Sequence, residues 1–225
     1  SFISKNLNNY NFSTLAGAYN IATNSVSLYG DDIDIDSNKL SHDFSFFGKQ
    51  DFNFSGNVKN LELKVNLHDI KNNFYVVGNF TKCIISYKKN HILNFSGSVK
   101  SNLDTFLITF NSTNTALSYS SILRKDPFFN NINGSVEISN FSNPIINIKG
   151  LSFVNKDIKI DFNGFINYQN DKIKVISHID SLNMQNATDY IPLAFMKEKS
   201  SLWFKKSFKS GKTNNGRILL NGKLS

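Results

Sequence analysis

The chain has 225 residues, 40% hydrophobic and 19% charged, which is typical of a folded protein and excludes intrinsic disorder. No run of about 18 apolar residues occurs, so the sequence contains no candidate transmembrane helix. The single cysteine, Cys83, excludes an internal disulfide and a cysteine-built metal site, and we expect it to be a buried, small apolar residue.

The formal net charge of +8 raises the question of a polyanionic partner. The lysines are scattered, with adjacent pairs only at Lys88–Lys89 and Lys205–Lys206. A nucleic-acid-binding protein usually concentrates its basic residues in one patch, so we expect no nucleic-acid partner. Anionic lipid head groups stay open as partners, although the codon usage of an AT-rich genome explains the richness in lysine more simply.

Alternation of apolar and polar residues with a period of two is the main pattern. In ELKVNLHD, for example, Leu63, Val65 and Leu67 fall on one face of a strand. Strands with one apolar and one polar face are typical of antiparallel sheets. The apolar same-face sets, which we predict to line a groove, are Phe44/Phe46, Phe52/Phe54, Leu63/Val65/Leu67, Phe106/Ile108/Phe110, Val136/Ile138, Ile158/Ile160/Phe162 and Ile173/Val175.

A short element recurs along the chain, with an apolar residue on each side of a central glycine. Its glycines are Gly17, Gly56, Gly78, Gly97, Gly134, Gly164 and Gly222. Glycine inside a strand often marks a bulge or a bend, so its repetition predicts a sheet that curls. The predicted fold is mainly β, a long curved antiparallel sheet forming an open groove, with short helical inserts near 117–125 and 187–210.

The second insert contains the clearest helical pattern. Ser200 and Ser201 can cap a helix, and Gly211 can end it. Its apolar face would consist of Leu202, Trp203, Phe204 and Phe208, with Lys205, Lys206 and Lys209 in the last turn. Two interpretations stay open: a lid packed on the end of the sheet, or a helix that faces lipid or a membrane surface.

Catalytic and metal-binding patterns are missing from the sequence. The four histidines lie far apart, and no GxSxG, Walker A or Rossmann glycine motif occurs. Asp32, Asp34 and Asp36 have the spacing of a calcium loop, but Ser37 stands where such a loop has glycine. A strand with acidic residues facing water explains them better. We therefore predict no catalytic residues, no metal site and no cofactor.

The C-terminal part carries a resemblance to a known family. The stretch from Asn186 to Ser225 resembles a signature of AsmA-like proteins of the YhdP type: an aromatic–aliphatic–Pro element, a helix with a central Trp, and a Gly-bearing strand. The matching positions are Tyr190, Pro192, Trp203, Gly211, Gly216 and Gly222. The similarity covers residues 117–225, whereas residues 1–116 match only in kind, as Gly-bearing β repeats.

This resemblance implies an extended β-groove, of which residues 1–225 would form one part. It further implies an upstream anchor in the inner membrane of a bacterial envelope, a periplasmic location, and phospholipid transport toward outer-membrane components. The acyl chains of phospholipids would then be the ligands. The chain starts at Ser1 and stops after a strand-like segment, so we expect a fragment.

Two alternatives remain. One is a non-transporting periplasmic scaffold for outer-membrane assembly, with the groove filled by the chain's own helices. The other, an outer-membrane barrel or surface adhesin, is less favoured, because the alternating runs are mostly shorter than the strands of such a barrel.

Overall fold

The structure of the chain is a computed structural model. It describes residues 12–36, 52–68, 74–87, 90–102, 105–118, 123, 125–140, 143–190, 198–207 and 209–224.

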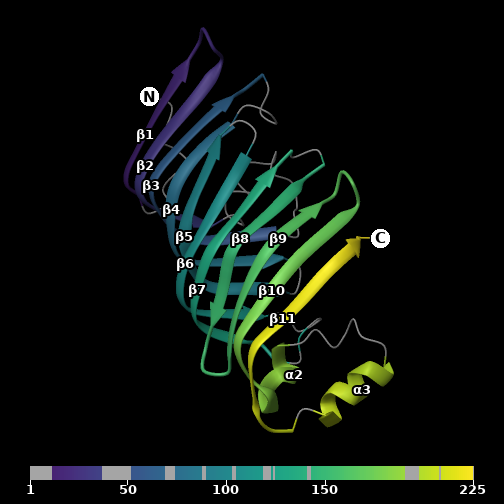
Figure 1. Ribbon diagram of the computed structural model, residues 1–225. Coiled ribbons are helices and arrows are strands. Elements are labelled where there is room, and N and C mark those ends of the chain that lie inside the picture. Colours follow the sequence, from purple (N-terminus) through teal and green to yellow (C-terminus); the bar gives the residue numbers. More distant parts are fainter. Residues whose placement is uncertain are drawn as a thin grey trace.

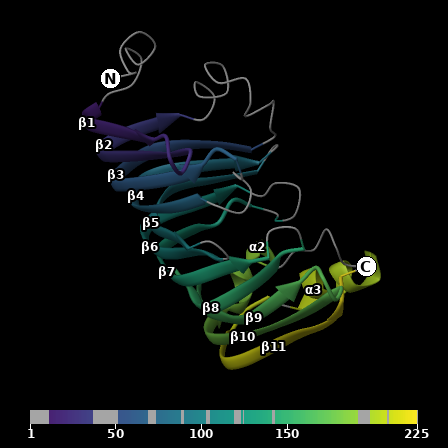
Figure 2. The same ribbon diagram turned by 90° about the horizontal axis from the view of Figure 1, so that it is seen from above.

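Eleven strands form one antiparallel sheet whose order in space is the order in the chain. The strands are β1 (Phe12–Asn20), β2 (Ser25–Asp36), β3 (Phe52–Asn66), β4 (Phe74–Tyr87), β5 (Asn90–Asn102), β6 (Thr105–Ser118), β7 (Phe128–Ser139), β8 (Ile145–Val154), β9 (Ile158–Asn167), β10 (Lys172–Asn183) and β11 (Lys212–Lys223). Figures 1 and 2 show this meander from two directions. Each strand pairs with its chain neighbours, and β1 and β11 are the two edges, so the sheet is open. The predicted fold class is confirmed.

The strands have 9 to 15 residues. They are longer than the alternating runs in the sequence, most of which span five to seven residues. The pairing register shifts inside several strand pairs, for example between Phe80 and Cys83 and between Ile148 and Leu151. Such a bulge interrupts the period-two pattern without ending the strand. One long bent strand therefore reads in the sequence as two shorter ones.

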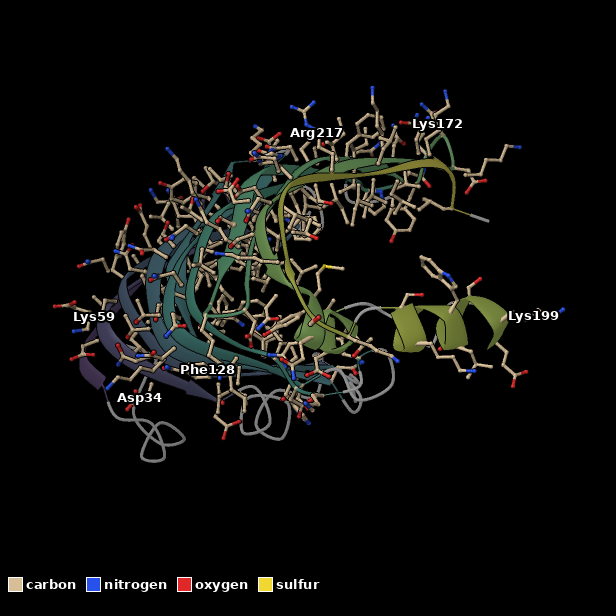
Figure 3. The ribbon with its side chains drawn as sticks, turned by 60° about the horizontal axis from the view of Figure 1, so that its bottom comes forward. Asp34, Lys59, Phe128, Lys172, Lys199 and Arg217 are labelled. Carbon is tan, nitrogen blue, oxygen red and sulfur yellow. The ribbon has the colours of Figure 1, made fainter. Side chains whose placement is uncertain are left out.

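The bulges bend the sheet across the strand direction. Residues with positive φ lie in the bulged segments, including Asn60 (52°), Lys82 (52°) and Asn94 (59°). Figure 3 shows the result, a sheet that curves around one of its faces, with the labelled Lys59 and Arg217 pointing away from the enclosed side. We call the enclosed side the concave face and the other the convex face.

Two clusters of buried side chains lie on the concave face. The first, which we call the β3–β5 cluster, consists of Val58, Phe80, Cys83 and Phe95. The second, the α2 cluster, consists of Phe129, Ile132, Ile158, Ile160, Ile179, Leu182 and Ala187. Phe110 of β6 packs against both clusters.

Three short helical elements follow β10: the 3-10 helix η2 (Met184–Asn186), α2 (Ala187–Tyr190) and α3 (Glu198–Ser207). Figure 1 places α2 and α3 at the end of the sheet that carries β10 and β11. The helical insert predicted over 187–210 is present, but α3 begins at Glu198. Ser200 and Ser201 therefore lie inside its first turn, and their predicted capping role is wrong.

The other helical insert, predicted near 117–125, is wrong at its start, because strand β6 continues through Leu117 and Ser118. The amide of Leu117 donates a backbone hydrogen bond of 2.9 Å to the carbonyl of Pro127, which ties the end of β6 to the start of β7. Residues 119–122 and 124 lie outside the described residues. In the part of the chain that the structure covers, no helix is long and apolar enough to cross a bilayer.

Candidate functional site

Two rows of apolar side chains run across the strands on the concave face. Residues paired between neighbouring strands point to the same side of a sheet, so the registers assign each residue to a face. The first row is Val99, Ile108, Val136, Ile148, Val175 and Leu220, with Gly164 at its place in β9. The second row is Phe106, Ile138, Ile146, Ile166 and Ile173, ending at Gly222. We call them the apolar rows.

The apolar rows are less buried than the two clusters. Most of their side chains are half-buried, and Leu220 on the edge strand is 55% exposed. Ile218, on the same face of β11, is 54% exposed. An apolar sheet face normally packs against a second layer, and the described residues leave these two side chains of the edge strand more than half exposed.

Several residues predicted from the sequence to line a groove lie in the apolar rows: Phe106, Ile108, Val136, Ile138, Ile173 and Val175. Leu63 and Val65 share their face in β3 and pair with Leu28 and Val26 of β2. Leu67 follows the end of β3 and is 45% exposed. Phe44 and Phe46 lie outside the described residues, as do the side chains of Phe52 and Phe54.

The predicted set Ile158, Ile160 and Phe162 has a different environment. Ile158 is 5% exposed and Ile160 is 9% exposed, and both belong to the α2 cluster, together with the fully buried Ala187 of α2. Phe162 packs edge-on against Phe153 with ring centroids 5.8 Å apart. Over this part of the concave face the chain's own helical segment takes the place of a second layer.

Polar contacts fix α2 to the β8–β9 turn. The side-chain amide of Asn155 donates to the Tyr190 hydroxyl at 2.9 Å and to the Phe128 carbonyl at 2.7 Å. The Tyr190 hydroxyl donates to Asp157 at 3.3 Å, and Asn186 donates to the other oxygen of the same carboxylate at 2.9 Å. Burial is the main cause that raises the pKa of Tyr190, so its hydroxyl stays protonated and able to donate.

The convex face carries polar and charged side chains. Asn57 donates to Asp32 at 2.7 Å and to Asp34 at 3.1 Å, while Ile33 between them is buried on the other face. The hydrogen bond from Lys149 lowers the pKa of Glu137. The position of Asp32 and Asp34, opposite the buried Ile33, agrees with the interpretation of this segment as a strand with its acidic residues facing water.

The described residues contain no group of three or more His, Cys, Asp or Glu side chains that could hold a metal ion. Cys83 is fully buried, as expected from the sequence, and its Sγ lies 3.5 Å from the Thr81 carbonyl oxygen. Burial raises the pKa of the Cys83 thiol to about 11, so the thiol is protonated at neutral pH. A protonated, buried thiol is a poor nucleophile.

The remaining motif residues frame the helical segment. Trp203 on α3 is 58% exposed, and Gly211, with φ 108°, precedes β11. A Cβ on Gly216 would lie 3.4 Å from the Cβ of Ile179, so this glycine brings β11 close to the α2 cluster. A Cβ on Gly222 would meet no atom within 4 Å. Pro192 lies outside the described residues.

Sequence reasoning missed part of the apolar rows. Ile146 and Ile148 alternate with Asn147 and Lys149 in β8, a period-two signal that identifies them as concave-face residues. The face of Leu220 was harder to predict from the sequence. It sits in the run Ile218–Leu219–Leu220, where apolar residues fall on both faces.

The family model described as YhdP protein matches residues 11–225, nearly the whole chain. The chain belongs to the YhdP family. Membership suggests a cell-envelope protein with a role in lipid transport, in a family not known for enzymatic activity. No curated protein and no solved structure matches the chain significantly.

Proposed function

We propose that this YhdP-family chain carries phospholipid acyl chains along the concave face of its sheet, as a periplasmic part of a carrier between the inner and outer membranes. The observation that carries the proposal is the pair of half-buried apolar rows, which cross the sheet from β5 or β6 to β11. The polar convex face would meet water.

The dimensions of the apolar rows suit an acyl chain. Neighbouring strands lie about 4.8 Å apart, so a row from β5 to β11 is about 29 Å long. One leaflet contributes about half of the ~30 Å hydrocarbon thickness of a bilayer, so the row is longer than one acyl chain. Each methylene group removed from water stabilises the bound lipid by about 0.8 kcal/mol. A continuous apolar surface can therefore bind an acyl chain without a tight polar site.

The proposed path excludes the α2 cluster. Ile158, Ile160 and Leu182 are buried against the chain's own helical segment, so we assign them to the core rather than to the lipid path. Lipid would follow the apolar rows, with Leu220 and Ile218 exposed on the β11 edge. We also propose that the protein is anchored in the inner membrane and meets outer-membrane components, as the resemblance implies.

A test compares the two faces of one strand. Ile173→Asp with Val175→Asp places two carboxylates in the apolar rows, whereas Lys174→Asp with Ile176→Asp places two on the convex face of the same strand. We expect phospholipid that co-purifies with the chain, measured by mass spectrometry, to fall at least about tenfold in the first variant only, because a charge in an apolar site costs more than about 1.4 kcal/mol.

Circular dichroism of both variants checks that the sheet is retained. Equal lipid content in the two folded variants would contradict the proposal, and so would a wild-type chain that carries no phospholipid.

The α2 cluster favours a second candidate function, a scaffold that carries no lipid. Ala187 is fully buried and Thr188 is 7% exposed, so α2 fills part of the concave face. In a scaffold the apolar rows would be covered in the same manner by another part of the envelope machinery. Wild-type chain free of phospholipid, together with normal folding, would favour this candidate.

A further inference from the structure

Helix α3 presents apolar side chains to solvent. Leu202 is 47% exposed and Trp203 is 58% exposed. A lid that packed these two residues on the end of the sheet would bury them, whereas the side chains of Phe204 and Phe208, the rest of the predicted apolar face, lie outside the described residues. Figure 3 shows α3 at the open side of the curved sheet, with the labelled Lys199 at its end and pointing away from the strands.

Two lysines extend the same stripe of the helix. Lys199, Leu202, Trp203 and Lys206 have the spacing i, i+3, i+4 and i+7, which places them on one side of an α-helix. Lys199 and Lys206 are exposed, one turn before and one turn after the apolar pair. Their long alkyl stems can lie along apolar surface while the ammonium groups reach a polar layer.

The charge of this segment selects the partner. Residues 198–212 contain five lysines and one glutamate. An indole beside a leucine suits the boundary between head groups and acyl chains, and lysine suits anionic phosphate groups. An acidic protein would match the lysines but would leave unexplained why the apolar pair stands between them.

We propose that the α3 stripe binds the surface of a bilayer that contains anionic phospholipid. Binding there would bring the open side of the concave face next to the lipid head groups. The proposed membrane contact involves α3 alone and does not require that the apolar rows carry lipid.

The full chain is tested with phosphatidylcholine vesicles with and without about one quarter phosphatidylglycerol. Trp203 is the only tryptophan of the chain, so its fluorescence reports on α3 alone. We expect a blue shift and protection from acrylamide quenching with the anionic vesicles, and co-sedimentation of the chain with them.

Two variants distinguish binding through the α3 stripe from attraction by the net charge of the chain. Lys199→Glu with Lys206→Glu reverses the stripe charges, and Lys172→Glu with Lys174→Glu makes the same change at two exposed lysines on the convex face of β10. We expect the first variant to lose at least about tenfold in affinity for anionic vesicles and the second less than about threefold. Leu202→Gln should weaken binding without a charge change.

Equal losses in the two charge variants would overturn the proposal, because net charge would then account for the attraction. An unshifted Trp203 spectrum would also overturn it, as would self-association in the absence of vesicles that Leu202→Gln abolishes, since a second copy would then be the partner. Ile173→Asp with Val175→Asp should bind vesicles normally, which separates failure of this proposal from failure of the lipid-carrier proposal.

Discussion

Glycines at the bends let neighbouring strands approach closely on the concave face. Gly134 of β7 has φ 125°, and a Cβ there would lie 2.5 Å from the Cα of Leu151. We predict that Gly134→Ala destabilises the protein by about 1–3 kcal/mol, because the methyl group meets backbone that cannot move without shifting β8. The midpoint of urea unfolding, followed by circular dichroism, measures the change.

Gly222→Ala is the control, because its Cβ would meet open space and its φ lies outside the range that strains a side chain. Its free energy of unfolding should stay within about 0.5 kcal/mol of the wild type. If both alanines shift the midpoint equally, the bend does not depend on close approach at Gly134.

At the scale of one element, the position of α2 depends on a small polar network. The Tyr190 hydroxyl links Asn155 and Asp157, two residues of the β8–β9 turn. We predict that Tyr190→Phe lowers the free energy of unfolding by about 1 kcal/mol and increases amide hydrogen exchange in residues 184–190. Tyr168, 53% exposed in the turn after β9, supplies the control. If Tyr168→Phe gave the same exchange profile, the network would not hold α2.

The strands were predictable from the sequence because alternation depends only on which face each residue meets. Ile173 and Val175, for example, were placed on the apolar face by period alone. The bends were harder to predict, because the residues with positive φ in the bulges are mostly asparagine, as at Asn60 and Asn94, and asparagine also occurs at many other positions of the chain. Glycine marked only some of them.

The division of the concave face was not predictable from the sequence. Ile158 and Ile173 lie in strands with the same alternation, yet one is buried against α2 and the other lies in an open row. The difference arises from where residues 184–190 fold back, which is a tertiary contact. Local pattern therefore identified the apolar face, and only packing separates core from candidate lipid path.

At the scale of the whole molecule, the sheet resembles a repeat protein in its contacts, since each strand pairs only with its neighbours in the chain. The β3–β5 cluster and the α2 cluster are separate, and Phe110 of β6 packs against both. Its ring lies 5.8 Å from that of Phe95. Local stability should therefore differ along the sheet, with β6 as the link between two halves.

We predict that core substitutions act on one half each. Ile160→Ala removes about 2–5 kcal/mol of local stability and should increase hydrogen exchange in β8–β10 while β3–β5 stay protected. Phe80→Ala should do the reverse, and Phe110→Ala should increase exchange in both halves, because its ring contacts both clusters. Hydrogen exchange of peptides from each half, measured by mass spectrometry, is compared among the three variants. A uniform increase across the sheet in all three would show that the eleven strands unfold as one cooperative unit.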